Sequence, residues 1–69
     1  LEPSQVKRLE QWVAAGSTPQ QVALRCRIAL MVNRGESVLH IAQVLEVQRP
    51  TVRLWRDRLA KEGIGTVWD

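Results

Sequence analysis

Apolar residues recur along most of the chain with the period of three to four residues that is typical of amphipathic helices. The alternation with a period of two that indicates a strand is not found anywhere. Glycine and proline divide the pattern into four segments. We therefore expect an all-α fold, a small four-helix domain with helices at about residues 3–15, 19–34, 38–45 and 49–62.

The residues at the ends of the first two segments predict how these helices begin and end. Pro3 suits a first helical turn, and Gly16 suits a C-terminal cap. For the second helix we expect Thr18 as the N-cap, Pro19 as the first helical residue and Gln21 as the capping-box partner. The apolar residues of this helix are too widely spread for one face, so we expect it to lie between the first helix and the rest of the domain.

The last two predicted helices are close together in the sequence. Ser37 is the expected N-cap of the third helix, and about three residues separate that helix from the fourth. The small Ala42 allows the two helices to cross closely, and Val47 fills the turn from inside. The expected core of the pair consists of Ile41, Ala42, Leu45, Val47, Val52, Trp55 and Leu59. Two short helices joined in this way are a helix-turn-helix arrangement.

The positive charge of the chain is concentrated on the fourth segment. The chain has a net charge of +3, whereas residues 49–61 alone hold five basic residues and one acid. Because the apolar stripe must face the core, the basic side chains point outward on a helix that fits the major groove of DNA. A solvated face of an ordinary helical bundle would explain the charge but not the tight pairing with the third helix. We expect double-stranded DNA as the partner.

The composition argues against catalysis and against a bound metal. A chain of 69 residues forms one small domain, its acids are scattered, and His40 has no nucleophile partner. The single cysteine, Cys26, excludes an internal disulfide and a cysteine-based zinc site, and it favours a reducing, cytosolic setting. No apolar run approaches the roughly 20 residues that span a bilayer. We expect no enzyme activity in this segment, no cofactor, no metal and no membrane.

A family resemblance is carried by the stretch IAQVLEVQRPTVRLWRDRLAKEG. It resembles the homeodomain-like helix-turn-helix of bacterial insertion-sequence transposases of the mariner-like superfamily, and the flanking TPQQVALRCRIALMVNRGES and KEGIGTVWD resemble the segments around that motif. The resemblance implies that the domain recognises the terminal inverted repeats of a transposon, while a downstream catalytic domain, absent from this chain, cuts the DNA. It also implies a bacterial, cytoplasmic and nucleoid-associated protein. A homodimer of the full-length protein is compatible with this role.

Three positions depart from the family pattern. Glu46 stands in the turn where glycine is usual, and a positive φ would strain it by about 1 kcal/mol, so we expect a wider turn. Gln48, a poor N-cap, replaces the usual serine, and Pro50 partly compensates by fixing φ in the first turn. His40 replaces the usual acid three residues after Ser37, and we expect it to face solvent or phosphate.

The expected DNA contacts lie at the N-terminus and on the outer side of the fourth helix. Arg49 and Arg53 are the candidates for reading guanine, and Arg56 and Arg58 for contacting phosphate from the flanks. Asp57 either orients Arg53 through an i,i+4 ion pair or accepts a hydrogen bond from a cytosine amino group. The whole predicted set is Gln48, Arg49, Pro50, Thr51, Arg53, Leu54, Arg56, Asp57 and Arg58.

Two other functions fit the same residues. A transcription regulator uses the same motif, and the sequence beyond residue 69 distinguishes it from a transposase. A helical protein–protein interaction module is the second alternative, with Trp12 and Trp68 as anchors. Without that role, Trp12 is expected in the core and Trp68 as a cover over the open end of the bundle. We expect the tail after Gly63 to begin ordered and then to fray.

Overall fold

The computed structural model describes all 69 residues and contains four α-helices followed by a short 3-10 helix. The elements are α1 (Pro3–Ala14), α2 (Gln20–Asn33), α3 (Val38–Leu45), α4 (Arg49–Glu62) and η1 (Ile64–Trp68). No strand is present, so the predicted all-α class is confirmed. None of the helices combines the length and the apolar composition that crossing a membrane requires.

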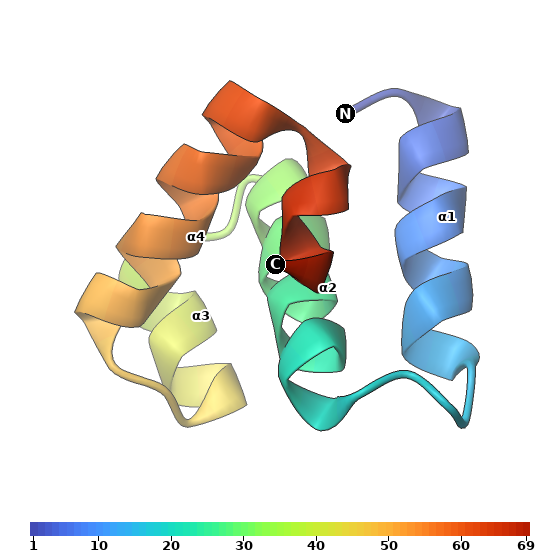
Figure 1. Ribbon diagram of the computed structural model, residues 1–69. Helices are drawn as coiled ribbons and strands as arrows, with labels where there is room; N and C mark the ends of the chain where they lie inside the picture. Colours follow the sequence, from blue (N-terminus) through green and yellow to red (C-terminus); the bar gives the residue numbers. More distant parts are fainter.

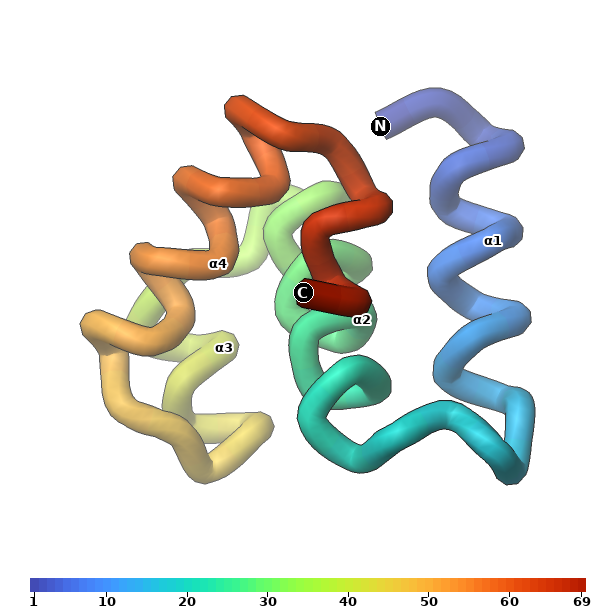
Figure 2. Tube along the Cα trace, viewed as in Figure 1, coloured from blue at the N-terminus to red at the C-terminus, as the bar shows by residue number.

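The second helix is the central element of the fold. In Figure 1, α1 lies along one side of α2, whereas α3 and α4 lie on its other side. The trace in Figure 2 shows that the chain turns back after α4, so that η1 crosses in front of α2. Because α2 contacts all four of the other elements, the prediction that it is covered from two sides is confirmed.

Two clusters of buried side chains form the core, one on each side of α2. The first cluster lies between α1, α2 and η1 and consists of Leu9, Val22, Cys26, Ala29, Ile64 and Val67. The second lies between α2, α3 and α4 and consists of Ile28, Met31, Ile41, Ala42, Val52 and Trp55. Leu59 of α4 packs against both clusters and so connects them. Burial raises the pKa of the Cys26 thiol, because the thiolate would lose its hydration.

The first helix ends differently from the prediction. Its C-cap is Ala15, whose backbone is extended, with φ −70° and ψ 126°. Gly16 does not adopt a positive φ, so the predicted glycine cap is wrong. The N-terminal end is held by a contact that the prediction missed, since the Glu2 N–H donates to Gln5 Oε1 at 3.1 Å.

The start of the second helix also corrects a prediction. Pro19 is the N-cap and has ψ 145°, so the helix begins at Gln20. No side chain caps this end, and the capping box expected between Thr18 and Gln21 is absent. The cause is the extended conformation of Pro19, which moves the cap one residue past Thr18 and removes the required spacing.

The tail does not fray as expected. Gly63 adopts φ 82°, which ends α4 and turns the chain into η1, where Ile64, Thr66 and Val67 are buried. Trp68 stacks edge-on against Trp12, with ring centroids 5.6 Å apart and an interplanar angle of 87°. The last residues therefore complete the first core cluster.

Candidate nucleic-acid interface

The turn between α3 and α4 is the usual tight turn rather than the wider one expected. Glu46 adopts the left-handed conformation, with φ 57° and ψ 46°, and its N–H donates to the Ala42 carbonyl oxygen. The Val47 N–H donates to the same oxygen at 3.0 Å. Glu46 adopts the strained left-handed conformation itself, and no extra residue enters the turn, which keeps three residues between Leu45 and Arg49.

The N-terminus of α3 is capped as predicted. Ser37 Oγ accepts a hydrogen bond from the backbone N–H of His40 at 3.1 Å. The His40 ring lies on the surface, where Nε2 is 2.9 Å from Glu36 Oε1. The histidine therefore faces solvent, with a carboxylate as its neighbour.

The N-terminus of α4 lacks a side-chain cap. Gln48 is the N-cap, with φ −72° and ψ 145°, and its side chain accepts no hydrogen bond from the first turn. Pro50 occupies the first turn, where it fixes φ. Pro50 has no N–H, and the Thr51 N–H donates to the Gln48 carbonyl oxygen at 3.1 Å, so the Arg49 N–H is the group of the first turn that lacks a partner within the chain. The positive end of the helix dipole at this N-terminus favours a negatively charged group such as a phosphate.

The inner side of α4 is fixed by packing against α2 and α3. Val52 and Trp55 are buried together with Ile41 and Ala42. Leu45, Val47 and Leu59 are partly buried and pack against the same cluster. These contacts set the rotation of α4 about its axis, and so decide which side chains point outward.

The outer side of α4 brings the predicted contact residues together at the surface. The exposed members are Gln48, Arg49, Pro50, Arg53, Leu54, Arg56 and Asp57, while Thr51 and Arg58 are partly buried. Neither Arg49 nor Arg53 makes a hydrogen bond or an ion pair with another residue of the chain. Their guanidinium groups are thus free to bind an anion or a base edge.

Asp57 does not pair with Arg53 as one prediction proposed. Its Oδ1 accepts from Arg56 Nε at 3.3 Å instead. Both side chains are largely exposed, so the pair adds little stability. The ion pair with Arg56 leaves Arg53 without a partner on its own helix.

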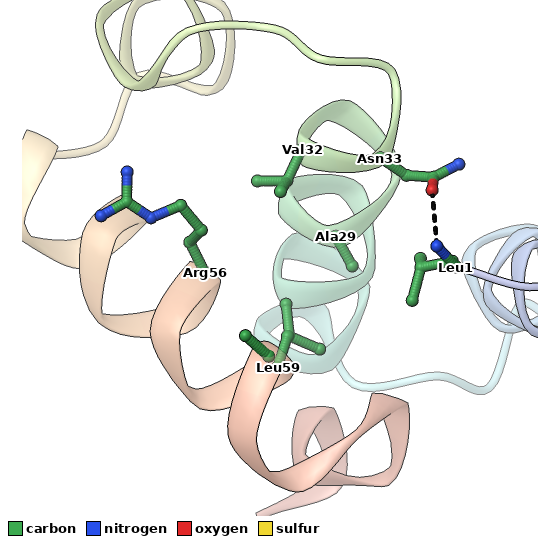
Figure 3. A pocket seen from close by; sticks show the side chains of 7 residues that line it. Leu1, Ala29, Val32, Asn33, Arg56 and Leu59 are labelled. Carbon is green, nitrogen blue, oxygen red and sulfur yellow. Dashed lines mark hydrogen bonds between the residues drawn. The ribbon is translucent and has the colours of Figure 1, made fainter.

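Arg56 lies on the flank of α4 that faces the end of α2. Figure 3 shows it beside a cleft of about 330 Å³, with Leu59 next to it on α4 and Val32 across from it on α2. Leu1 closes one end of the cleft, and its amino group donates to Asn33 Oδ1 at 3.0 Å.

Arg58 on the opposite flank is held by contacts within the chain. Its guanidinium lies 4.7 Å from the centre of the Trp55 ring and donates to Glu62 at 3.2 Å and to Asp69 at 3.4 Å. Arg25 of α2 lies 4.2 Å from the same ring centre and donates to the Val67 carbonyl oxygen at 3.1 Å. Sequence reasoning missed this cluster because no periodicity connects residue 25 with residues 55 and 67.

The comparison with known families agrees with this geometry. A family model described as a homeodomain-like domain matches residues 19–68. That range contains α2, α3, α4 and η1, and leaves α1 outside. No curated protein and no solved structure gives a significant match to the chain.

Proposed function

Because the chain belongs to the homeodomain-like family, we propose that it binds double-stranded DNA and inserts α4 into the major groove. The observation that carries the proposal is the pair of unpartnered guanidinium groups of Arg49 and Arg53 on the exposed side of α4. Here the inner side of the helix is anchored, so the outer side is presented rigidly to a ligand.

Within this proposal, Arg53 and Arg49 read base edges. A guanidinium can donate to guanine O6 and N7 together, which is worth about 1–3 kcal/mol of discrimination against other bases. Arg56, on the flank, contacts phosphate and positions the helix without reading sequence. The Arg49 N–H, which has no partner within the chain, adds a second phosphate contact at the start of α4.

The experiment that tests DNA binding is a salt titration with a random-sequence duplex. If the domain contacts about four phosphates, the logarithm of the binding constant should fall against the logarithm of salt concentration with a slope of roughly −3 to −4. A slope near zero would contradict the proposal.

A pair of matched variants localises the interface on α4. Replacing Arg49 and Arg53 by glutamate should abolish binding, since it reverses two charges at the centre of the proposed contact. Replacing Lys7 and Arg8 of α1 by glutamate changes the net charge by the same amount on an exposed helix outside the matched family region. This control should retain most of the affinity; an equal loss in both variants would show that only the total charge matters.

The more specific role that we propose is recognition of transposon ends. Its support is the resemblance of residues 41–63 to the helix-turn-helix of mariner-like insertion-sequence transposases. In that role the domain acts on the bacterial chromosome and delivers a separate catalytic domain to terminal inverted repeats, while doing no chemistry itself. A binding-site selection decides the matter: a selected site that recurs as inverted repeats around the encoding gene supports a transposase, whereas a site in a promoter supports a transcription regulator.

A further inference from the structure

A groove on the surface of α2 is left uncovered by every other helix except the end of α3. It consists of two adjacent hollows of about 500 Å³ and 220 Å³, which share Arg27 and Leu45. No residue of α1, α4 or η1 lines either hollow. We call this surface the α2–α3 groove; it is separate from the outer side of α4, where the DNA contacts are proposed.

The floor of the α2–α3 groove is apolar. Leu24 and Met31 of α2 and Leu45 of α3 line it, and Val44 stands beside them with 53% of its surface exposed. An apolar strip bordered by polar groups is typical of a protein-binding surface, because the free energy falls when a partner removes the apolar surface from water. Gln20 and Gln21 add polar side chains to the larger hollow, at the end where α2 begins.

The rim of the groove carries positive charge that the chain does not neutralise. Arg27 and Arg34 are exposed, and neither makes an ion pair or a side-chain hydrogen bond within the chain. No acidic residue lines the groove. Arg34 is the C-cap of α2 and follows Arg27 by seven residues, so the two arginines lie on the same side of the helix, about 10 Å apart along its axis.

We infer that the α2–α3 groove binds an amphipathic helix of a partner protein, with one apolar side and two acidic residues spaced seven positions apart. Such a helix would lay its apolar side on Leu24, Met31 and Leu45, in the helix-in-groove manner. Its two carboxylates would meet Arg27 and Arg34, because a spacing of two helical turns matches the spacing on α2. The lining from residue 20 to residue 34 extends about 21 Å along α2, enough for roughly four turns of a partner helix.

A synthetic peptide tests this inference. The probe is a helical peptide of about 16 residues with leucines along one side and two glutamates seven positions apart. The matched control peptide has glutamine in place of both glutamates. In amide NMR spectra of the 69-residue chain we expect saturable shifts at Leu24, Arg27 and Leu45 with the glutamate peptide, and binding at least about tenfold weaker with the glutamine peptide.

A charge exchange separates a specific contact from general attraction. The double variant Arg27→Glu/Arg34→Glu should lose the glutamate peptide and should bind a version of the peptide with lysines at those two positions. The variant Lys7→Glu/Arg8→Glu changes the net charge equally and should keep the glutamate peptide. Both substituted pairs are exposed, so both variants are expected to keep the far-ultraviolet circular dichroism of the parent.

Three results would overturn the inference. The first is no saturable binding of either charged peptide. The second is a set of shifts confined to the outer side of α4, which would mean that the peptide merely imitates DNA. The third is a lower salt slope for duplex DNA in the Arg27→Glu/Arg34→Glu variant, which would make the groove a phosphate contact. DNA binding by the parent chain is measured separately, so failure here leaves the proposed DNA function standing.

Discussion

Glu46 is the residue at which local strain and motif geometry meet. It is the one non-glycine residue of the chain with a positive φ, and its side chain is exposed. A left-handed conformation costs an ordinary residue roughly 1–2 kcal/mol. The helix-turn-helix geometry therefore survives at this position at the expense of stability.

We expect Glu46→Gly to stabilise the fold by about 1 kcal/mol, since glycine adopts positive φ without the clash of a Cβ atom. In a domain of this size the melting temperature should rise by roughly 4–8 °C. Gln43→Gly is the matched control, because Gln43 is exposed within α3, where glycine should destabilise by up to about 1 kcal/mol. Equal losses from both substitutions would show that Glu46 carries no strain in solution.

Trp55 is a structural residue on a helix that we propose for DNA binding. It is 7% exposed and lies in the cluster with Ile28 and Val52. Trp55→Ala should destabilise the domain by about 3–5 kcal/mol, mostly through lost burial and the cavity left behind. Urea unfolding measures the effect. A variant that stays as stable as the parent but loses DNA affinity would show that α4 is rotated relative to this structure.

At the scale of the element, α4 has two flanks that differ in what they can give to DNA. Arg56 pairs only with the exposed Asp57, and a phosphate group can take the place of this carboxylate at little cost in free energy. Arg58 contacts the Trp55 ring and two carboxylates, that of Glu62 on α4 and that of Asp69 at the end of the chain. Arg56 is thus available to contact phosphate, whereas Arg58 supports the fold. The charge pattern of the sequence does not distinguish these two roles.

Arg56→Ala should lower affinity for all duplexes and reduce the salt slope by about one, as expected for loss of one phosphate contact. Arg58→Ala should lower the free energy of unfolding by about 1 kcal/mol, because the contact with the Trp55 ring is lost. It should change the salt slope less than Arg56→Ala does. Thermal melting and salt titration of both variants check this. The assignment of the flanks is wrong if Arg58→Ala changes the slope more than Arg56→Ala does.

Arg53 belongs to the outer side of the same element, and its substitution tests base reading. We expect Arg53→Ala to relax the preferred site at one base pair while the salt slope stays nearly constant, because a base contact releases few counterions. Binding-site selection on parent and variant gives the answer. An unchanged preferred site with a lower slope would make Arg53 a phosphate contact.

At the scale of the whole molecule, the helices and the position of α2 between α1 and the other elements were predictable, whereas the ends of the helices and the contacts of particular polar side chains were not. The apolar period placed the four helices, and it also assigned Val52 and Trp55 to the inner side of α4. The predicted caps at Gly16 and Thr18 were wrong. Ala15 and Pro19 adopt extended backbone angles, which end α1 and begin α2 at positions that the preferences of single residues do not reveal.

For the candidate site, the exposure of side chains was predictable, but the partner of each charged group was not. Exposure of Arg49 and Arg53 follows from the helix period once Val52 faces inward. The partner of each charge does not follow, because a side chain with several rotatable bonds reaches more than one neighbour. Asp57 therefore joined Arg56, and Arg25 reached Val67 across 42 positions of sequence.

The joining of α1 to η1 makes Cys26 a reporter of how the molecule opens. The sole thiol of the chain is fully buried in the cluster that these two terminal elements share, and its raised pKa leaves little thiolate to react. A labelling reagent can thus reach it only when α1 and η1 separate from α2. If α1 and η1 detach together while the helix-turn-helix stays folded, the Cys26 thiol will be labelled faster than the whole domain unfolds. The labelling rate will then report how often the domain opens at its termini with α3 and α4 still in place.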